Sequence, residues 1–235
     1  MLSNLYKRLP RFIRSFLYQA VLDQAKKHVR QNERTKDQEI ESAIPHIELS
    51  IEHIRNLQVL INRDSLLSVL PQHSVVAEVG VAQGAFSAKI LSITNPRKFH
   101  LIDSWTHDVR YLDLMEKIES RFAQEIKQGQ VFIHQGFSTT QLSVFDDGYF
   151  DWVYIDTSHD YETTLKELEI CRSKVKDRGI IAGHDYVTGS WLSRSRYGVV
   201  EAVHEFCVKY GWEMIYLTHE SNRHLSYALS QITER

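Results

Sequence analysis

Residues 75–87 read VVAEVGVAQGAFS, and this stretch decides the fold of the chain. The run Val75–Val79 predicts a strand that is covered on both faces. Gly80 and Gly84 then allow a tight turn, and the helix that follows directs the positive end of its dipole toward the space above that turn. A strand, a glycine turn and a helix open a βαβ unit. The spacing is ExGxxxG rather than GxGxxG, which argues against a dinucleotide such as NAD.

The chain beyond Pro71 repeats this alternation of short apolar runs and helical stretches. Strands are expected at Val75–Val79, Phe99–Ile102, Val131–His134, Trp152–Ile155, Gly179–Ala182, Met214–Leu217 and Ser226–Leu229. Helices are expected at about 85–93, 111–128, 161–175 and 198–210. The pattern predicts an α/β, Rossmann-like, doubly wound fold with a mostly parallel sheet of seven strands and an N-terminal helical extension.

The N-terminal segment is strongly basic although the chain as a whole is nearly neutral. Lys and Arg number 28 against 30 Asp and Glu, whereas residues 1–30 hold seven bases and one acid. Apolar residues recur there at three- and four-residue steps, which predicts a basic amphipathic helix that Pro10 bends or restarts. Such a helix makes a peripheral membrane contact with anionic lipid, packs on its own domain, or packs across a homo-oligomer.

Two domain boundaries follow from composition. Residues 31–45 lack a sustained apolar stripe, so we interpret 1–45 as the basic helix followed by a polar linker. Helical spacing returns between Ile47 and Leu70, which predicts one or two lead-in helices over 46–70. We therefore expect a main domain over 46–235.

Composition also limits the class of protein. With 43% hydrophobic and 25% charged residues the chain is globular, and its near-neutral charge argues against a nucleic-acid partner. The two cysteines stand in no zinc-ligand or CxxC spacing, which indicates a reduced, cytoplasmic compartment, with membrane association if the basic helix binds lipid. No apolar stretch is long enough to cross a membrane.

Ligands of an open parallel sheet bind where the carboxyl ends of the strands meet. Asp103 ends the second expected strand about twenty residues beyond the glycine turn. A carboxylate there accepts hydrogen bonds from both hydroxyls of a ribose, although a plain turn residue is the alternative.

Two further loops at the same edge carry acids and imidazoles. Asp156 and His159 follow the fourth expected strand, and His184 and Asp185 follow the fifth. Neighbouring strands lie about 4.8 Å apart, so these four side chains should meet in one mouth. Carboxylates suit Mg²⁺ or Ca²⁺, and added imidazole shifts the preference toward Mn²⁺, Fe²⁺ or Zn²⁺. Helix capping is the structural alternative for Asp156 and Asp160.

The order of these features resembles the class I S-adenosylmethionine-dependent methyltransferases over about residues 63–217. In that family the first loop holds the methionine part of the cofactor, the acid after the second strand binds the ribose, and the turn after the third strand meets the adenine. The resemblance implies cofactor contacts at Glu78, Gly80, Gly84, Ser87, Asp103, Gly136 and Ser138. Trp105 either covers one face of the adenine or anchors its own loop.

The second half of the chain is similar to the metal-assisted O-methyltransferases of small molecules and sugars, including macrolide-sugar and cephalosporin-biosynthesis relatives. That branch holds its metal with one acid after the fourth strand and an acidic pair after the fifth. Asp156 and Asp185 match this pattern, whereas His184 stands where an acid is common. The resemblance implies a divalent metal on Asp156, His184 and Asp185, and a small-molecule or glycan acceptor.

The reaction explains why such groups are needed. A hydroxyl with a pKa of about 15 does not attack a sulfonium methyl unaided, whereas a bound metal lowers that pKa and a nearby His or Asp takes the proton. We expect O-methylation, with His159 and Asp156 as the catalytic residues. The alternatives are a metal-dependent hydrolase or hydroxylase that uses the same cluster, and a non-catalytic interaction protein on a methyltransferase-like fold.

Residues 186–197 read YVTGSWLSRSRY and directly follow the loop after the fifth expected strand. Their aromatic and arginine side chains would suit a lid that contacts a sugar, with an ordinary surface loop as the alternative.

Overall fold

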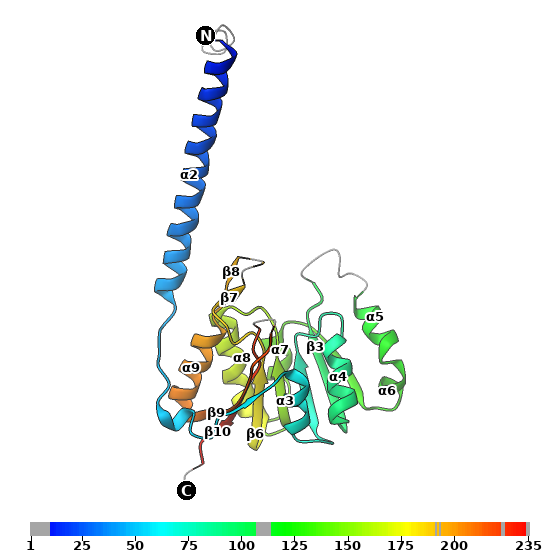
Figure 1. Ribbon diagram of the computed structural model, residues 1–235. Coiled ribbons are helices and arrows are strands. Elements are labelled where there is room, and N and C mark those ends of the chain that lie inside the picture. Colours follow the sequence, from blue (N-terminus) through cyan, green and yellow to red (C-terminus); the bar gives the residue numbers. More distant parts are fainter. Residues whose placement is uncertain (1–9, 107–113, 191, 193, 222–223, 234–235) are drawn as a thin grey trace. The chain divides into compact units, whose positions relative to one another are not determined.

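The structure is a computed structural model that describes residues 10–106, 114–190, 192, 194–221 and 224–233 (Figure 1). The chain divides into two compact units, Met1–Pro45 and His46–Arg235. No helix among the described residues has the length and the hydropathy needed to cross a membrane.

The described residues of the N-terminal unit form a long helix, α2, over Arg11–Ala43. Pro10 occupies the N-cap position, so it marks the start of this helix rather than a bend within it. Most of the segment predicted as a linker, 31–45, is helical instead. Residues 31–43 contain no Gly or Pro and are rich in Glu, Lys, Arg and Gln, which favour a helix even without an apolar stripe. The helix ends at Ala43 because Ile44, which precedes a proline, is extended.

The second unit is built on a mixed sheet whose strands lie in the order β1-β9-β10-β6-β5-β2-β3-β4. The strands are β1 (Gln58–Leu60), β2 (Val75–Val79), β3 (Lys98–Asp103), β4 (Val131–Gln135), β5 (Phe150–Ile155), β6 (Val175–Gly183), β9 (Trp212–Thr218) and β10 (Tyr227–Gln231). β10 is antiparallel to both of its neighbours, and the other pairs are parallel. The start of β10 therefore reaches the same edge of the sheet as the carboxyl ends of β5 and β6.

Helices cover both faces of this sheet (Figure 1). One face packs against α3 (Arg63–Val69), α4 (Ala85–Thr94) and α5 (Leu114–Arg121). The other packs against α7 (Ser138–Ser143), α8 (Tyr161–Lys174) and α9 (Val199–Tyr210). All five residues of β2 are buried, as expected for a strand covered on both sides. This arrangement is the predicted Rossmann-like architecture.

The described sheet has eight strands rather than the predicted seven. The additional strand is β1, which lies in the segment 46–70 that was expected to be helical. That segment instead forms a short 3-10 helix, η1 (Ile51–His53), then β1, then α3. The prediction of helix was wrong at β1, because this strand has only three residues and is stabilised by its parallel pairing with the distant β9.

Smaller differences occur in three loops. The helix expected at 111–128 is divided into α5 and α6 (Ala123–Lys127), and its first three residues lie outside the described part. The turn after β4 continues directly into α7. The segment 186–197 contains a short hairpin of β7 (Gly189–Ser190) and β8 (Ser195–Arg196).

Candidate active site

The glycine turn after β2 is tightly packed against the loop after β5. Gly80 has a φ of +92°, and a Cβ there would lie 1.9 Å from the carbonyl oxygen of Asp156. Gly84 has a φ of +69°, and a Cβ there would lie 2.5 Å from Cδ1 of Ile118. At each position only glycine accommodates both the positive φ and the lack of space for a Cβ. Gly84 also immediately precedes α4, so backbone N–H groups face the space above the turn.

Asp103 is the residue that fixes this turn. Its Oδ2 accepts hydrogen bonds from the backbone N–H groups of Val81 at 2.8 Å and Ala82 at 2.9 Å. Its Oδ1 accepts one from the N–H of Trp105 at 2.9 Å. A carboxylate oxygen has capacity for a second hydrogen bond, so these contacts leave room for a ribose hydroxyl.

Trp105 lies in the loop after β3 and is buried, with a relative exposure of 6%. Its indole N–H donates to the carbonyl of Ala82 at 3.2 Å. The contacts agree with the alternative in which this ring anchors its own loop against the glycine turn.

A cavity of about 550 Å³ opens beside the glycine turn. Four of the predicted site residues line it: Gly80, Asp103, Ser138 and Asp156. The other lining residues are Ala82, Ile102, Ser104, Phe137, Thr157, Ser158, Asp160 and Thr163. Glu78, Gly84, Ser87, Trp105 and Gly136 were also predicted to contact a cofactor, and they are not among the lining residues.

Glu78 and Ser87 lie beneath the turn rather than in the cavity. Glu78 is 2% exposed, and its Oε2 has no hydrogen-bond partner among the described residues. Ser87 is also fully buried, and its hydroxyl lies close to this carboxyl. Burial raises the pKa of Glu78 to about 8, which indicates that this carboxyl is mostly protonated at neutral pH.

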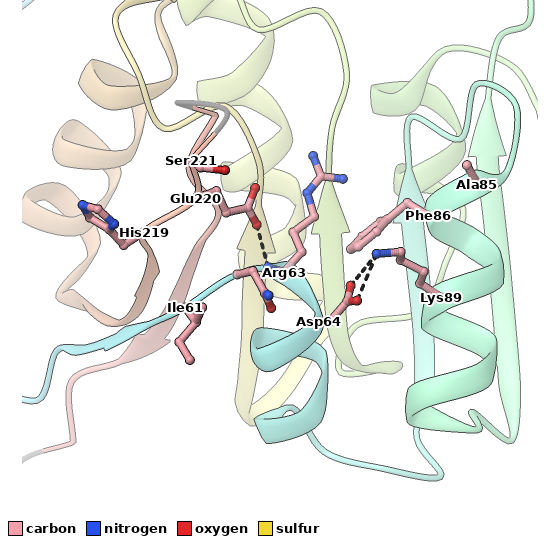
Figure 2. A pocket seen from close by; sticks show the side chains of 10 residues that line it. Ile61, Arg63, Asp64, Ala85, Phe86, Lys89, His219, Glu220 and Ser221 are labelled. Carbon is pink, nitrogen blue, oxygen red and sulfur yellow. Dashed lines mark hydrogen bonds and ion pairs between the residues drawn. The ribbon is translucent and has the colours of Figure 1, made fainter.

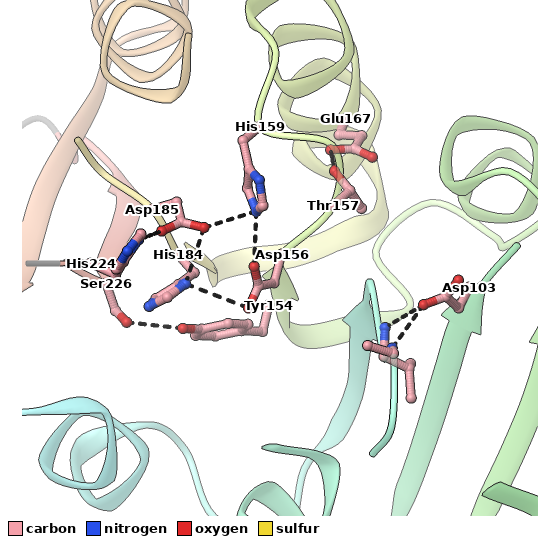
Figure 3. A network of polar contacts seen from close by, with 12 residues as sticks. Asp103, Tyr154, Asp156, Thr157, His159, Glu167, His184, Asp185, His224 and Ser226 are labelled. Carbon is pink, nitrogen blue, oxygen red and sulfur yellow. Dashed lines mark hydrogen bonds and ion pairs between the residues drawn. The ribbon is translucent and has the colours of Figure 1, made fainter. Parts of the chain in front are cut away.

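A polar cluster occupies the mouth beyond β5 and β6 (Figure 3). Ligand atoms of Asp156, His184 and Asp185 all lie within 4.8 Å of one another, close enough to hold one metal ion. His159 Nε2 donates to Oδ2 of Asp185 at 2.9 Å and to Oδ1 of Asp156 at 3.2 Å. The structure therefore brings together all four residues that were predicted for this mouth.

The cluster is held by opposite charges. Burial opposes ionisation of Asp156, but hydrogen bonds from His159 and His184 outweigh it and lower the pKa of that carboxyl to about 2. The pKa of Asp185 is lowered further by the same two imidazoles. Burial likewise opposes the imidazolium of His159, whereas its bonds to Asp156 and Asp185 raise the pKa to about 9.

The backbone at two of these positions adopts the left-handed region. His159 has a φ of +62° and Asp185 a φ of +57°. Such conformations cost about 1 kcal/mol or more for a residue other than glycine and concentrate at functional sites. Helix capping, the structural alternative, applies to Asp160, which accepts a hydrogen bond from Thr163 N–H at 2.8 Å at the start of α8.

Three further residues contact this cluster: Arg63 and His224 were not predicted as site residues, and Tyr197 was predicted only as part of a lid. The guanidinium of Arg63 lies 3.6 Å from Oδ2 of Asp156, and the ring of Tyr197 lies 4.8 Å from the ring of His159. Nδ1 of His224 contacts Oδ1 of Asp185. His224 reaches the cluster because β10 is antiparallel to β6, so the loop that enters β10 lies at the same edge as the carboxyl end of β6.

Arg63 also lines a second hollow of about 650 Å³ (Figure 2). The Arg63 guanidinium stands 4.6 Å from the centre of the Phe86 ring. The ammonium group of Lys89 is bound to Asp64 at 2.7 Å, and Glu220 accepts the backbone N–H of Arg63 at 2.5 Å. Arg63 thus connects this hollow to Asp156.

The β7–β8 hairpin adjoins the cluster through its last residues. The N–H of Gly198 donates to the carbonyl of His159 at 2.8 Å, next to the Tyr197 contact. The Arg196 guanidinium pairs with Glu201 on α9 at 2.5 Å. Trp191, which was predicted to belong to a lid, lies outside the described residues.

The fold and the mouth together define a class: a Rossmann-like α/β domain with an acid- and histidine-lined site. Residues 77–186, which contain the glycine turn, Asp103 and the polar cluster, match a family model for a methyltransferase domain. No curated protein matches the chain.

Solved structures share this fold at low sequence identity. A SAM-dependent methyltransferase from Aquifex aeolicus is 13% identical with a TM-score of 0.54, over 74% of this chain and 91% of that one. The pyocyanin biosynthetic protein PhzM is 11% identical with a TM-score of 0.53, over 68% of this chain and 51% of that one. The methyltransferase CalH, solved with SAH, is 10% identical with a TM-score of 0.52, over 72% and 55%. The chain thus spans about half the length of the last two.

The part of the chain with the glycine turn and the polar cluster therefore resembles a methyltransferase domain, and the solved structures share its fold.

Proposed function

We propose that the protein is a SAM-dependent O-methyltransferase that acts on a hydroxyl of a small molecule or sugar with the help of a divalent metal ion. The observation that carries this proposal is the double position of Asp156. This residue lines the cavity with Gly80 and Asp103, and it also belongs to the Asp156, His184 and Asp185 cluster. A cofactor in that cavity would therefore have its reacting end next to the cluster.

The two hollows divide the ligands between them. We assign the cofactor to the 550 Å³ cavity, because it contains Gly80, Asp103 and Ser138. We assign the acceptor to the 650 Å³ hollow, where the Arg63 guanidinium lies beside the Phe86 ring and 3.6 Å from Asp156. An acceptor there meets an aromatic ring and a guanidinium, which are groups that bind sugar rings and anionic substituents.

The donor atoms fit a divalent ion. Two carboxylates and one imidazole within 4.8 Å of one another form a mixed oxygen and nitrogen set that suits Mn²⁺, Fe²⁺ or Zn²⁺, and Mg²⁺ with added water. A bound divalent ion would lower the pKa of an acceptor hydroxyl and orient its oxygen.

His159 is the candidate base, because its Nε2 lies 3.2 Å from Oδ1 of Asp156, which lines the cofactor cavity. Asp156 and Asp185 both accept hydrogen bonds from its Nε2, and this pairing favours the imidazolium. A cation on the same carboxylates compensates their charge, which lowers the pKa of His159 toward the range in which it accepts a proton. The carboxylate of Asp156 also aligns the acceptor relative to the methyl group.

Calorimetric titration with SAM and SAH, followed by turnover assays over a panel of hydroxylated acceptors with and without Mn²⁺, tests the proposal. We expect both SAM and SAH to bind. We also expect the rate of SAH formation in the turnover assay to fall when EDTA removes the metal. Absence of SAM binding would refute the proposal at its first step. Metal-dependent turnover without SAM would instead favour a hydrolase or hydroxylase.

A further inference from the structure

His224 lies in the connection between β9 and β10, about forty residues beyond Asp185 (Figure 3). Its side chain is 29% exposed, and Nδ1 contacts Oδ1 of Asp185. The ring also lies nearly parallel to the ring of His184, at 6.0 Å between centres and an angle of 25°. His224 therefore contacts one proposed metal ligand and packs beside another.

The sheet fixes the position of His224. Leu225, the next residue, accepts a hydrogen bond from the N–H of Tyr186 at 3.0 Å. Tyr227 then pairs with Gly183 in the antiparallel ladder between β10 and β6. Residues on both sides of Asp185 are thus tied to residues next to His224, so the contact follows from the register of the two strands.

The two oxygens of Asp185 have different partners. Oδ2 faces the cluster, where it lies 2.9 Å from Nε2 of His159 and 3.5 Å from Nδ1 of His184. Oδ1 faces away and contacts Nδ1 of His224. A carboxylate that accepts a hydrogen bond on one oxygen is prevented from rotating and presents the other oxygen alone.

We propose that His224 is a positioning residue, which donates a hydrogen bond from Nδ1 to Oδ1 of Asp185 and so directs Oδ2 toward a divalent cation shared with Asp156 and His184. The inference rests on the proposed metal site. It states that Asp185 binds the cation through one oxygen. Hydrogen bonds to a ligating side chain are worth about 10- to 100-fold in metal affinity.

The test compares substitutions that place a donor at different points. In H224N the amide nitrogen occupies the place of Nδ1, whereas in H224Q it occupies the place of Nε2, and H224A has no donor. The dissociation constant for Mn²⁺ alone is measured on the full chain by electron paramagnetic resonance of the free ion. We expect H224A and H224Q to weaken Mn²⁺ binding by about 10- to 100-fold and H224N by less than about threefold.

His219, which lies in the same connection, provides the matched control, and H219A should leave Mn²⁺ affinity unchanged. Thermal melting and SAH titration of each variant verify the fold. Equal Mn²⁺ affinity of wild type, H224A and H224Q would overturn the inference and leave the metal site standing. Equal loss in H224N and H224Q, both folded, would also overturn it, because a packing role does not depend on donor position. Absence of Mn²⁺ binding by the wild type would refute the metal site itself, and the role of His224 with it.

Discussion

The two halves of the mouth are built by different means. On the side of β2 and β3, backbone N–H groups make the contacts, and Asp103 binds them while two glycines provide the shape. On the side of β5 and β6, side chains make the contacts, and ionised groups compensate one another within a few ångströms. The first half therefore depends on glycine geometry and on the single carboxylate of Asp103, whereas the second depends on several charges that compensate one another.

The largest effect should come from Asp185, because its substitution disrupts only the ionised side-chain cluster on the side of β5 and β6. D185N keeps the shape of the side chain but removes the charge that His159, His184 and His224 share. We expect kcat to fall by about 10³-fold, with SAH affinity within about threefold. Steady-state kinetics and calorimetry measure the two. D177N on an exposed position of β6 is the control, and a parallel loss of SAH binding would contradict the division into halves.

Gly80 packs directly against the backbone of Asp156, so its substitution should disturb both the glycine turn and the polar cluster. A Cβ at Gly80 meets the backbone of Asp156, which cannot move without disturbing β5. We expect G80A to lower the free energy of unfolding by about 3 kcal/mol, as measured by urea denaturation. Gly148 also has a positive φ but has open space around it, so G148A should cost only about 1 kcal/mol. Equal losses would show that backbone strain rather than contact sets the demand for glycine at position 80.

Substitution of Asp103 should affect only the glycine turn on the side of β2 and β3. D103N removes the charge that binds the N–H groups of Val81 and Ala82 and the proposed ribose contact. We expect the dissociation constant for SAH to rise about 30-fold, while Mn²⁺ affinity changes by less than about threefold. A calorimetric titration of each ligand checks this. Loss of Mn²⁺ binding would mean that the two halves are coupled.

Glu78, which is buried beneath the glycine turn, should make the free energy of unfolding depend on pH. Its pKa of about 8 in the folded state lies above the ordinary value of 4.5, so the folded protein binds a proton that the unfolded chain releases. The resulting stability is present at low pH and is lost as pH rises toward 8, at about 1 kcal/mol per unit between pH 6 and 8. Urea denaturation at several pH values should show this slope in the wild type and a flatter one in E78Q. E119Q, on an exposed position of α5, should keep the slope, and an unchanged slope in E78Q would contradict the assignment.

The N-terminal unit should have the smallest effect on chemistry. His46–Arg235 is compact by itself and contains both halves of the mouth. Removal of residues 1–45 should change kcat/KM by less than about twofold in a steady-state assay. A large loss of turnover in a folded 46–235 protein would assign α2 a part in substrate binding.

Local patterns were sufficient to predict most of the parallel sheet. The runs at 75–79 and 152–155 are apolar because both faces of those strands are buried, and the half-buried edge run at 131–134 is also mostly apolar, so each run could be recognised from its own residues. β1 carried none, since a three-residue edge strand owes its structure to pairing with β9. The break between α5 and α6 was also invisible, because Phe122 continues the apolar spacing while its backbone leaves the helix.

The candidate site was predictable where it follows parallel strands. Asp156, His159, His184 and Asp185 all come directly after β5 or β6, and this placement alone predicted that they would meet. Arg63 and His224 approach the cluster from elements whose position depends on the whole topology, namely the start of α3 and the antiparallel β10. The pairing of His224 with one oxygen of Asp185 depends on strand register, which residue spacing does not specify.

The place of β10 between β6 and β9 has a consequence for the order of assembly. β10 is the last of the described strands, yet it occupies an interior position of the sheet, so β9 and β1 cannot join β6 until it has been synthesised. The half with Asp103 and the glycine turn can form on an unfinished chain, because its strands β2, β3, β4 and β5 are contiguous in sequence and adjacent in space. We therefore expect a nascent chain on the ribosome to acquire its nucleoside cavity before residues 224–231 complete the metal-binding side.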